Sequence, residues 1–540
     1  MRNVVLIGFM GTGKSAVGQI LARRLGWAFL DTDQRVAARE RATIPQIVAR
    51  HGEAYFRDAE ARVIAELAGR RDVVIATGGG AVLRPENMQR LRAHGWIISL
   101  TAPADALLKR LADGERRPLL RGDVRQNVIK LLDQRRPLYR DADLMVDVSV
   151  ASPERVADAV LNFLASRERR TIPVRLTDRA YPVHVGDGIL ALLPVDLREA
   201  GAGRRAAVLS HRRVLSAVGD ALLAVLRAAG YDVTVLEVPA GEQSKSLAVS
   251  GRLFTRLARA RADRHTTLIT LGGGVVGDLG GFVASAYMRG IRLVHVPTTL
   301  LAMVDSSIGG KTGVNHAGAK NLIGAFYQPA AVVADVRHLR SLPERELRSG
   351  LAEVIKAAVI GDATLFAYLE EHLTAVLRRE TGPLTEAIVR AVAFKARVVE
   401  VDVLDRAERQ ILNYGHTIGH AVEAAAGFHR LTHGEAIAIG MALEAQLARR
   451  LGLVDAAAVE RQNALLGRAG LPVRLGAVSR TAVLRALTLD KKHKDGVLRW
   501  PMLVGIGQVR REQEVPDTLL REVVSGPDPR RLRPQSQPAR

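Results

Sequence analysis

The chain of 540 residues contains no cysteine. This absence excludes a disulfide scaffold, a thiol nucleophile, thiolate-bound zinc and iron–sulfur clusters. Any metal site must therefore use histidine or carboxylate ligands. Aromatic residues are also scarce, at 4% of the chain, which leaves little material for the stacking platforms that bind single-stranded nucleic acid. An apolar fraction of 48% is nonetheless ordinary for a folded protein.

Long uninterrupted hydrophobic runs are missing as well. The most apolar stretch, residues 268–288, is broken by six glycines and by Asp278, and so does not fit a membrane-spanning helix. The apolar opening at residues 1–10 is too short and wrongly flanked for a signal peptide. We therefore expect a protein without a membrane partner and with a cytoplasmic location.

Acidic residues are outnumbered by basic ones, 56 against 78, which gives a formal net charge of +22. Such an excess can indicate nucleic-acid binding, and a basic nucleic-acid-binding NTPase is one alternative for the whole chain. The basic residues are spread along the sequence, however, and no helix-turn-helix or RNA-binding signature accompanies them. Anionic small-molecule substrates explain the charge equally well, so we expect no nucleic-acid partner.

The order of apolar runs predicts an α/β protein with two units. Residues 1–166 alternate strand-like and amphipathic stretches, which indicates a parallel sheet with helices on both faces. A short charged stretch at 167–171 is the expected linker. Residues 172–343 predict a second α/β region, and the helical periodicity of residues 344–524 predicts an all-helical half. Residues 525–540, rich in Pro, Arg and Gln, are expected to be disordered.

Residues 8–15 read Gly-Phe-Met-Gly-Thr-Gly-Lys-Ser, a complete G-x-x-x-x-G-K-S motif between a predicted strand and a predicted helix. The backbone N–H groups of such a loop hold phosphate oxygens, Lys14 reaches the β- and γ-phosphates, and Ser15 ligates Mg²⁺. A chance glycine-rich loop is the plain alternative, but this one has the flanking strand and helix that the motif requires. We expect ATP with Mg²⁺ at Gly11, Thr12, Gly13, Lys14, Ser15 and Ala16.

Further polar residues follow predicted strands, at the sheet edge where ligands bind. Asp31-Thr32-Asp33 offers one carboxylate to order Mg²⁺-bound water and another to accept a substrate hydroxyl proton. An Asp-x-Asp at a strand end is, however, as often a turn or a helix cap. Arg57, the three glycines at 78–80 and the basic segment 116–120, a candidate lid over phosphates, complete the set.

Residues 1 to about 166 resemble shikimate kinase. The resemblance rests on the motif at 8–15, Asp31-Thr32-Asp33, Phe56-Arg57, Gly78-Gly79-Gly80, Arg117-Pro118-Leu119-Leu120 and Arg135 with Leu138-Tyr139. It implies that shikimate is held by Asp33, Arg57, Gly79 and Arg135, where guanidinium groups suit the carboxylate. It implies catalytic roles for Lys14, Asp33 and Arg117, with Arg117 on ATP and Arg110 stacked on adenine. Another P-loop kinase of a small polyol is the alternative for this half.

The second half contains a weaker glycine signal and a sharper histidine signal. Residues 271–278, Leu-Gly-Gly-Gly-Val-Val-Gly-Asp, follow a predicted strand, and glycines there permit close approach to a pyrophosphate. His416 and His420 lie four residues apart on one predicted helical face, with His433 and Glu353 elsewhere in the same half. Two histidines and a carboxylate leave an open position on zinc, the catalytic arrangement. Any three of these four residues qualify as ligands, and histidines of the surface or core are the plain alternative.

Basic residues form the third signal of this half. They are Arg289, Lys311, Lys320, Lys356, Lys395, Arg409 and Lys492. Lys311 lies in the segment Asp305-Ser-Ser-Ile-Gly-Gly-Lys311-Thr-Gly, which indicates a loop rather than a helix face and favours anion binding.

Residues 172 to about 507 resemble 3-dehydroquinate synthase. The matching segments lie at 272–278, 287–290, 296–313, 320–324, 350–356 and 412–420. The resemblance implies Zn²⁺ or Co²⁺ on Glu353, His416 and His433. It implies NAD⁺ at Glu242, Lys245, Gly273, Gly274, Gly277, Asp278, Thr298, Thr299, Lys311 and Lys320. It implies a substrate held by Arg289, Asp305, Asn321, Lys356, Lys395, Asn413 and Lys492, with catalytic roles for Lys311, His420, Asp405 and Arg409.

The two resemblances together imply a bifunctional enzyme of chorismate and aromatic amino acid biosynthesis. One activity would phosphorylate shikimate to shikimate 3-phosphate with ATP. The other would convert 3-deoxy-D-arabino-heptulosonate 7-phosphate to 3-dehydroquinate and phosphate, with NAD⁺ regenerated within the cycle. The family implies a homodimer through the synthase half, with Arg289 reaching into the partner subunit. A metal-dependent polyol dehydrogenase relative is the alternative for this half, but it would need no phosphate grip.

Two positions depart from the family pattern. Asp405 stands where the family often has glutamate, one methylene longer, which bears on proton handling nearby. Ser210-His211 stands at the strand end that often carries an aspartate for the adenosine ribose of NAD⁺.

Overall fold

The computed structural model describes residues 2–111, 123–317, 319–427, 430–489 and 498–526. Three predicted features lie outside these ranges: Arg117 with its lid segment, Lys492, and the tail from residue 527 onward. The chain forms two compact units. Unit 1 comprises residues 1–169, 188–201 and 221–231, and unit 2 comprises residues 170–187, 202–220 and 232–540.

Unit 1 is built on a five-stranded parallel sheet in the order β2-β3-β1-β4-β5. Its strands are β1 (Asn3–Gly8), β2 (Ala28–Asp31), β3 (Val73–Ala76), β4 (Gly95–Thr101) and β5 (Leu144–Asp147). β1 and β3 are buried along their whole length, as expected for central parallel strands covered on both faces. Both read as continuous apolar runs for that reason.

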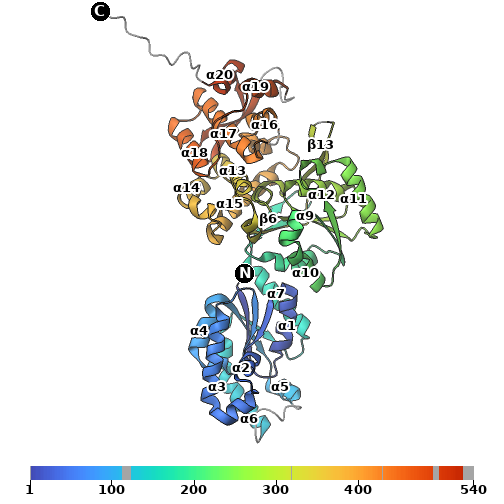
Figure 1. The fold of residues 1–540 in the computed structure, drawn as a ribbon, viewed down its shortest axis with the longest axis vertical. Helices are drawn as coiled ribbons and strands as arrows, with labels where there is room; N and C mark the ends of the chain where they lie inside the picture. Colours follow the sequence, from blue (N-terminus) through green and yellow to red (C-terminus); the bar gives the residue numbers. More distant parts are fainter. Residues whose placement is uncertain (1, 112–122, 318, 428–429, 490–497, 527–540) are drawn as a thin grey trace, which may run out of the picture. The chain divides into compact units, whose positions relative to one another are not determined.

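Helices cover both faces of this sheet, as the sequence predicts (Figure 1). The helices are α1 (Lys14–Leu25), α2 (Thr32–Glu40), α3 (Ile44–Ala68), α4 (Pro85–His94), α5 (Ala104–Leu111), α6 (Val124–Arg140), α7 (Pro153–Glu168) and α8 (Leu193–Glu199). One apolar cluster joins α1 and α7 to one face, and a second joins α3, α4 and α6 to the other. Loops at the carboxyl ends of the strands are thereby held above a rigid platform.

The α/β half of unit 2 contains a seven-stranded sheet in the order β6-β7-β14-β11-β10-β8-β9. Its strands are β6 (Arg170–Arg175), β7 (Ala180–Gly186), β8 (Arg205–His211), β9 (Asp232–Val238), β10 (Thr267–Gly272), β11 (Arg292–Pro297) and β14 (Ala331–Asp335). All neighbours pair in parallel except β6 and β7, which pair antiparallel. The glycine-rich segment thus begins at the end of β10, near the middle of the sheet.

The helices of this half are α9 (Arg212–Val214), α11 (Leu247–Arg259) and α12 (Gly274–Ala286), whereas α10 (Asp220–Ala228) belongs to unit 1 from Ala221 onward. A hairpin of β12 (Lys311–His316) and β13 (Ala319–Phe326) follows β11. Two glycines let α12 lie close to its neighbours: a Cβ at Gly280 would stand 2.3 Å from Thr270 Cγ2, and one at Gly281 would stand 2.2 Å from Thr312 Cγ2. The glycines of this helix are therefore needed for packing as well as for the loop before it.

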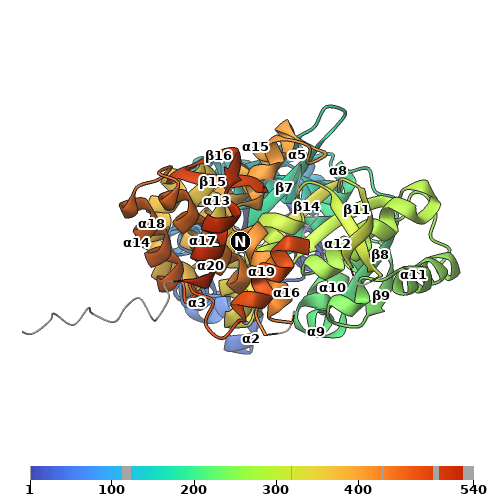
Figure 2. The same ribbon diagram turned by 90° about the horizontal axis from the view of Figure 1, so that it is seen from above.

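The other half of unit 2 is mainly helical, beside the sheet (Figure 2). Its helices are α13 (Glu344–Gly361), α14 (Ala363–Leu377), α15 (Thr381–Val401), α16 (His416–Ala425), α17 (His433–Arg450), α18 (Ala456–Arg468), α19 (Arg480–Leu489) and α20 (Asp517–Ser525). This confirms the predicted fold class. One addition is a hairpin, β15 (Leu498–Gly505) with β16 (Gln508–Val515), whose Trp500, Met502 and Leu503 are buried in the helical core.

In the described part of the chain, no helix is both long and apolar enough to cross a membrane.

Candidate active sites

The phosphate-binding loop of unit 1 connects β1 to α1. Gly8, Gly11 and Gly13 have φ values of 141°, 82° and 83°, a left-handed region that disfavours side chains. A Cβ at Gly8 would also lie 2.3 Å from the carbonyl oxygen of Leu100. Lys14 Nζ donates to the carbonyl oxygens of Gly8 and Phe9, both at 2.9 Å. The lysine is thereby held over the loop whose N–H groups and helix N-terminus suit a phosphate.

The two aspartates after β2 have different surroundings. Asp31 accepts a hydrogen bond from Ser15 Oγ at 2.8 Å and caps α2 by accepting from the backbone N–H groups of Asp33 and Gln34. It therefore lies beside the predicted Mg²⁺ ligand Ser15. Asp33 points toward the glycines after β3, since a Cβ at Gly78 would stand 2.5 Å from Asp33 Oδ1. The hydroxyl-binding role predicted for Asp33 is compatible with this placement.

A buried cluster of charge lies around the predicted shikimate site. Arg57 donates to Glu60 at 2.8 Å and to Glu53 at 3.1 Å, and Glu60 is fully buried. Burial raises the pKa of Glu60, and Asp33 adds to this while Arg57 opposes it. Glu53 and Glu60 were not predicted, although their spacing from Arg57 on α3 was a usable signal. These carboxylates hold the guanidinium of Arg57 in place.

The remaining kinase residues lie near the same edge. Arg135 Nη1 and Tyr139 Oη both approach the carbonyl oxygen of Gly79, at 3.4 and 2.6 Å. Arg110 donates to the carbonyl oxygen of Val148 at 2.5 Å, so its guanidinium lies against the loop that follows β5. The structure thus brings Asp33, Arg57, Gly79 and Arg135 to one place.

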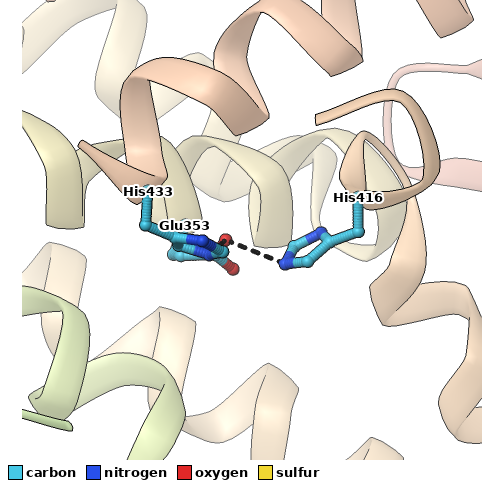
Figure 3. Close-up of side chains that lie close together, drawn as sticks. All are labelled: Glu353, His416 and His433. Atoms are coloured by element: carbon cyan, nitrogen blue, oxygen red, sulfur yellow. Dashed lines mark ion pairs between the residues drawn. The ribbon is translucent and has the colours of Figure 1, made fainter. Parts of the chain in front are cut away.

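The candidate metal centre lies in the helical half of unit 2 (Figure 3). Its three side chains come from three helices. Glu353 belongs to α13, and His416 and His433 are the first residues of α16 and α17. The Nε2 atoms of both histidines lie 3.5 Å from Glu353 Oε1. That oxygen is buried and has no hydrogen-bond partner within the described residues. A carboxylate oxygen left in this state between two imidazoles fits a divalent metal ion.

A second set of ligands shares His433. His420, Glu423 and His433 also come close enough to hold a metal ion, so all four residues considered from the sequence gather in one region. Glu423, however, is already engaged, since Lys320 Nζ lies 2.6 Å from its Oε1. Glu353 also pairs with a lysine, Lys356, but through Oε2, which leaves its buried Oε1 between the two imidazoles. The set of Glu353, His416 and His433 is the better metal site for this reason. Glu423 was not predicted, and only its distance of three residues from His420 hinted at it.

Charges around the candidate metal centre shift the pKa values of its ligands in different directions. Burial alone would raise the pKa of Glu353, but Lys356, 2.5 Å away, and the two imidazoles lower it well below its usual value. Burial and Lys356 lower the pKa of His416 well below its usual value. Burial would also lower the pKa of His433, but Glu353 and Glu423 raise it to about 9. Metal binding would therefore displace a proton from His433.

Glycines and one buried acid position the helices that carry the ligands. A Cβ at Gly440 of α17 would lie 2.0 Å from the carbonyl oxygen of Gly415, and one at Gly434 would lie 2.0 Å from that of Ser349. The carboxylate of Glu444, fully buried, accepts from the N–H groups of Gly415 and Ile418 at 2.6 and 3.2 Å. Glu444 thus holds the first turn of α16, where His416 begins.

A large cavity of about 1060 Å³ extends from the end of β8 past the glycine loop to the metal centre. Its lining includes these residues predicted for NAD⁺: Glu242, Lys245, Gly273, Gly274, Asp278, Thr298, Thr299 and Lys320. His420, Glu423 and His433 line it as well. Two predicted NAD⁺ residues are placed elsewhere, because Gly277 faces the ring of His295 and Lys311 lines the neighbouring cavity. Burial raises the pKa of Asp278 to about 6 against the opposing effect of Lys245.

The neighbouring cavity has a volume of about 450 Å³ and is rich in cations. Predicted residues in its lining are Asp305, Lys311, Asn321, Lys395 and Arg409. Lys395 Nζ lies 2.5 Å from Asp305 Oδ1, and Lys311 pairs with Asp405. Arg409 Nη1 donates to the carbonyl oxygens of Gly309 and Val403 at 3.0 and 3.1 Å. These contacts hold three cationic groups in the lining of one cavity, an arrangement that suits an anionic ligand.

Three predicted substrate residues are not in the lining of either cavity. Lys356 is buried beside Glu353 and donates to the carbonyl oxygen of Leu412 at 2.9 Å. Asn413 is half-buried at the end of the short turn Glu408–Asn413 (η9). Arg289 is exposed at φ 65°, on the turn after α12. Asp405 has φ 57°, a left-handed conformation that aspartate adopts more readily than most residues.

Comparison with known proteins decides the family. A family model described as 3-dehydroquinate synthase N-terminal matches residues 235–349, and one described as 3-dehydroquinate synthase C-terminal matches residues 350–493. A 3-dehydroquinate synthase of Acidithiobacillus ferrooxidans (strain ATCC 53993 / BNL-5-31) is 46% identical over 355 residues, which cover 66% of this chain and 97% of that relative. The chain belongs to the 3-dehydroquinate synthase family.

Unit 1 matches a second protein family. Residues 10–165 match the shikimate kinase family model, so a kinase unit precedes the synthase unit in one chain. Both resemblances stated from the motifs are thereby confirmed, and the polyol dehydrogenase and nucleic-acid alternatives are not favoured.

Two solved structures resemble the synthase unit. One is a 2-deoxy-scyllo-inosose synthase complexed with carbaglucose-6-phosphate, NAD⁺ and Co²⁺, 29% identical, covering 66% of this chain and 99% of that chain with a TM-score of 0.60. The other is 2-epi-5-epi-valiolone synthase from Streptomyces hygroscopicus subsp. jinggangensis 5008 with NAD⁺ and Zn²⁺ bound, also 29% identical with a TM-score of 0.60, covering 65% of this chain and 97% of that chain.

Proposed function

We propose that this chain catalyses two steps of chorismate biosynthesis, as a shikimate kinase and as a 3-dehydroquinate synthase. The single observation that carries the synthase proposal is the position of the metal centre. Glu353, His416 and His433 lie together, and His433 lines the cavity that contains Gly273 and Gly274. That cavity shares lining residues with a second one, lined by Lys311, Lys395 and Arg409.

In the kinase unit, the P-loop and Lys14 would hold the phosphates of ATP, and Ser15 would ligate Mg²⁺ beside Asp31. Arg57 and Arg135 would pair with the carboxylate of shikimate. Asp33 would accept the proton of the hydroxyl group that is phosphorylated. Arg110 would stack on the adenine of ATP. Arg117, which lies outside the described residues, would contact ATP from the lid segment.

In the synthase unit, the proposed cofactors are NAD⁺ and Zn²⁺ or Co²⁺, as printed for the two structural neighbours. When bound, NAD⁺ supplies a reversible hydride acceptor and the metal ion a Lewis acid for the oxygen atoms that are oxidised and reduced. Lys311, Lys395 and Arg409 would neutralise the phosphate and carboxylate groups of the seven-carbon substrate. Asp305 would orient Lys395, and Asp405 would orient Lys311.

His420 is exposed to the large cavity and lies close to His416, with ring centroids 5.2 Å apart. It would move a proton at the substrate oxygen nearest the metal centre. Asn321, Asn413 and Lys492 would contact the substrate, and Arg289 would contact it in a partner subunit of a homodimer. We also propose a cytoplasmic location. The linker predicted at 167–171 is taken up instead by the end of α7 (Pro153–Glu168) and the start of β6 (Arg170–Arg175).

Phosphate release from 3-deoxy-D-arabino-heptulosonate 7-phosphate tests the synthase proposal directly. We expect turnover that needs NAD⁺, stops on chelation and leaves no net NADH. Net NADH from a polyol without phosphate release would instead indicate a dehydrogenase. Shikimate-dependent formation of ADP with Mg²⁺, measured on the same preparation, tests the kinase and also serves as the folding control.

A further inference from the structure

The end of β8 lies where a dinucleotide fold meets the adenosine ribose. β8 pairs with β10, the strand that leads into Gly273 and Gly274. In such folds, a carboxylate near this position accepts a hydrogen bond from the free 2′-hydroxyl of NAD⁺, whereas an arginine accommodates a 2′-phosphate. This chain has Ser210, His211, Arg212 and Arg213 here, so the group that recognises the ribose has to be found among them.

Only two of these four side chains can reach a bound dinucleotide. Ser210 is buried, and its hydroxyl donates to the carbonyl oxygen of Leu271 at 2.6 Å, so it ties β8 to β10. Arg212 is exposed and does not line the large cavity, whereas His211 and Arg213 both do. The part of the lining that comes from residues 211–218 contains no acidic side chain.

The side chains of His211 and Arg213 can both form further hydrogen bonds. His211 Nδ1 is buried and has no partner among the described residues. Arg213 is exposed and forms no ion pair within the described part of the chain. Val214, Ala217 and Val218 provide an apolar wall beside them. An apolar wall next to an imidazole and a guanidinium fits an adenine ring whose ribose carries an anion.

We propose that this end of the cavity accepts an adenine dinucleotide with a phosphate on the 2′-oxygen of its adenosine ribose, such as NADP⁺, in addition to NAD⁺. The inference rests on the proposed dinucleotide function of the cavity. A guanidinium group forms charge-assisted, two-point hydrogen bonds to phosphate. A carboxylate at the end of β8 would repel the phosphate, and residues 210–213 contain none. Glu242, which lines the same cavity after β9, is held by Asn315 and Lys245.

Binding of NAD⁺ and NADP⁺ to the full chain tests the proposal, with titration calorimetry in the presence of saturating Mg²⁺ and ADP to occupy the kinase unit. We expect dissociation constants for the two dinucleotides within about tenfold of each other. Arg213→Ala should weaken NADP⁺ binding about tenfold relative to NAD⁺ binding, and His211→Asp should shift the preference toward NAD⁺. Arg212→Ala is the matched control, because it removes a neighbouring charge that lies outside the lining.

The possible failures are distinguishable. If NAD⁺ binds and NADP⁺ binds more than about a hundredfold more weakly, this inference is wrong while the proposed synthase function stands. If neither dinucleotide binds metal-loaded protein, the proposed function itself fails. If Arg213→Ala and Arg212→Ala change the preference equally, the effect is one of general charge and the site is refuted.

Discussion

Two ligand sets could hold the metal ion, and they differ in whether Glu353 or Glu423 supplies the carboxylate. Glu353 pairs with Lys356 through Oε2, but its buried Oε1 has no hydrogen-bond partner in the described part of the chain and lies between two histidines, whereas Glu423 Oε1 is bound to Lys320. We expect Glu353→Gln to abolish stable metal binding, because a ligand charge is lost. Glu423→Gln should weaken binding only about 10–100-fold, as for residues that orient a ligand. Metal content after dialysis, measured by mass spectrometry, checks this, and the reverse order would assign the ion to the other set.

His295 predicts a pH dependence of stability. It is buried in β11, accepts or donates a hydrogen bond with Thr270 at 2.6 Å, and burial lowers its pKa to about 4. Because the unfolded chain binds the proton near pH 6.5 and the folded one does not, stability is complete above that pH and is lost as pH falls toward 4. Between pH 7 and pH 5 the loss should be about 2 kcal/mol.

Urea unfolding of the synthase unit at both pH values measures this loss. His295→Gln should lower stability at pH 7 but should flatten the pH dependence. His265→Gln, at an exposed position of the same unit, should leave the pH dependence as it is. An unchanged slope in His295→Gln would show that another group titrates.

At the scale of elements, the crossing of α16 and α17 sets the metal centre. Gly440→Ala would place a methyl group 2.0 Å from the carbonyl oxygen of Gly415, so the two helices must separate. We expect a loss of about 1–3 kcal/mol in stability together with weaker metal binding, because His416 and His433 begin these helices. Gly467→Ala in α18 is the control, since its methyl group would meet nothing within 4 Å. Thermal unfolding and metal content distinguish the two variants.

The secondary-structure elements that carry each site residue explain which parts of the sites could be predicted from the sequence. The P-loop and the His416–His420 pair are short motifs, and local spacing on a strand end or a helix is enough to identify them. The acids that support them are not, because Glu444 and Glu60 act through contacts made only when helices pack. The hairpin β15–β16 was not predicted for a similar reason. Trp500 and Met502 are buried because the hairpin packs against the helical core, a contact that the local sequence pattern does not show. The position of Arg213 in the large cavity likewise needed the fold.

At the scale of the whole molecule, the described residues that line each candidate site come from one unit. We expect Lys14→Ala to lower kinase turnover about 10²–10³-fold and to leave synthase turnover within twofold of the wild type. Glu353→Gln should do the reverse. Both assays on both variants, with thermal unfolding as a folding control, check this expectation. A loss of the second activity in a variant that remains folded would show that the two sites are linked.

The wall between the two cavities of the synthase unit has a kinetic consequence. Asp278, Asp305, Ser306 and Asn321 line both of them, so a molecule in the smaller cavity stands against the contents of the larger one. We predict that the dinucleotide loads first and the sugar phosphate second. Because the proposed reaction regenerates NAD⁺, the dinucleotide would not need to leave between successive cycles. Initial rates should then follow a compulsory order, and pre-loaded protein should turn over for many rounds after free dinucleotide is removed.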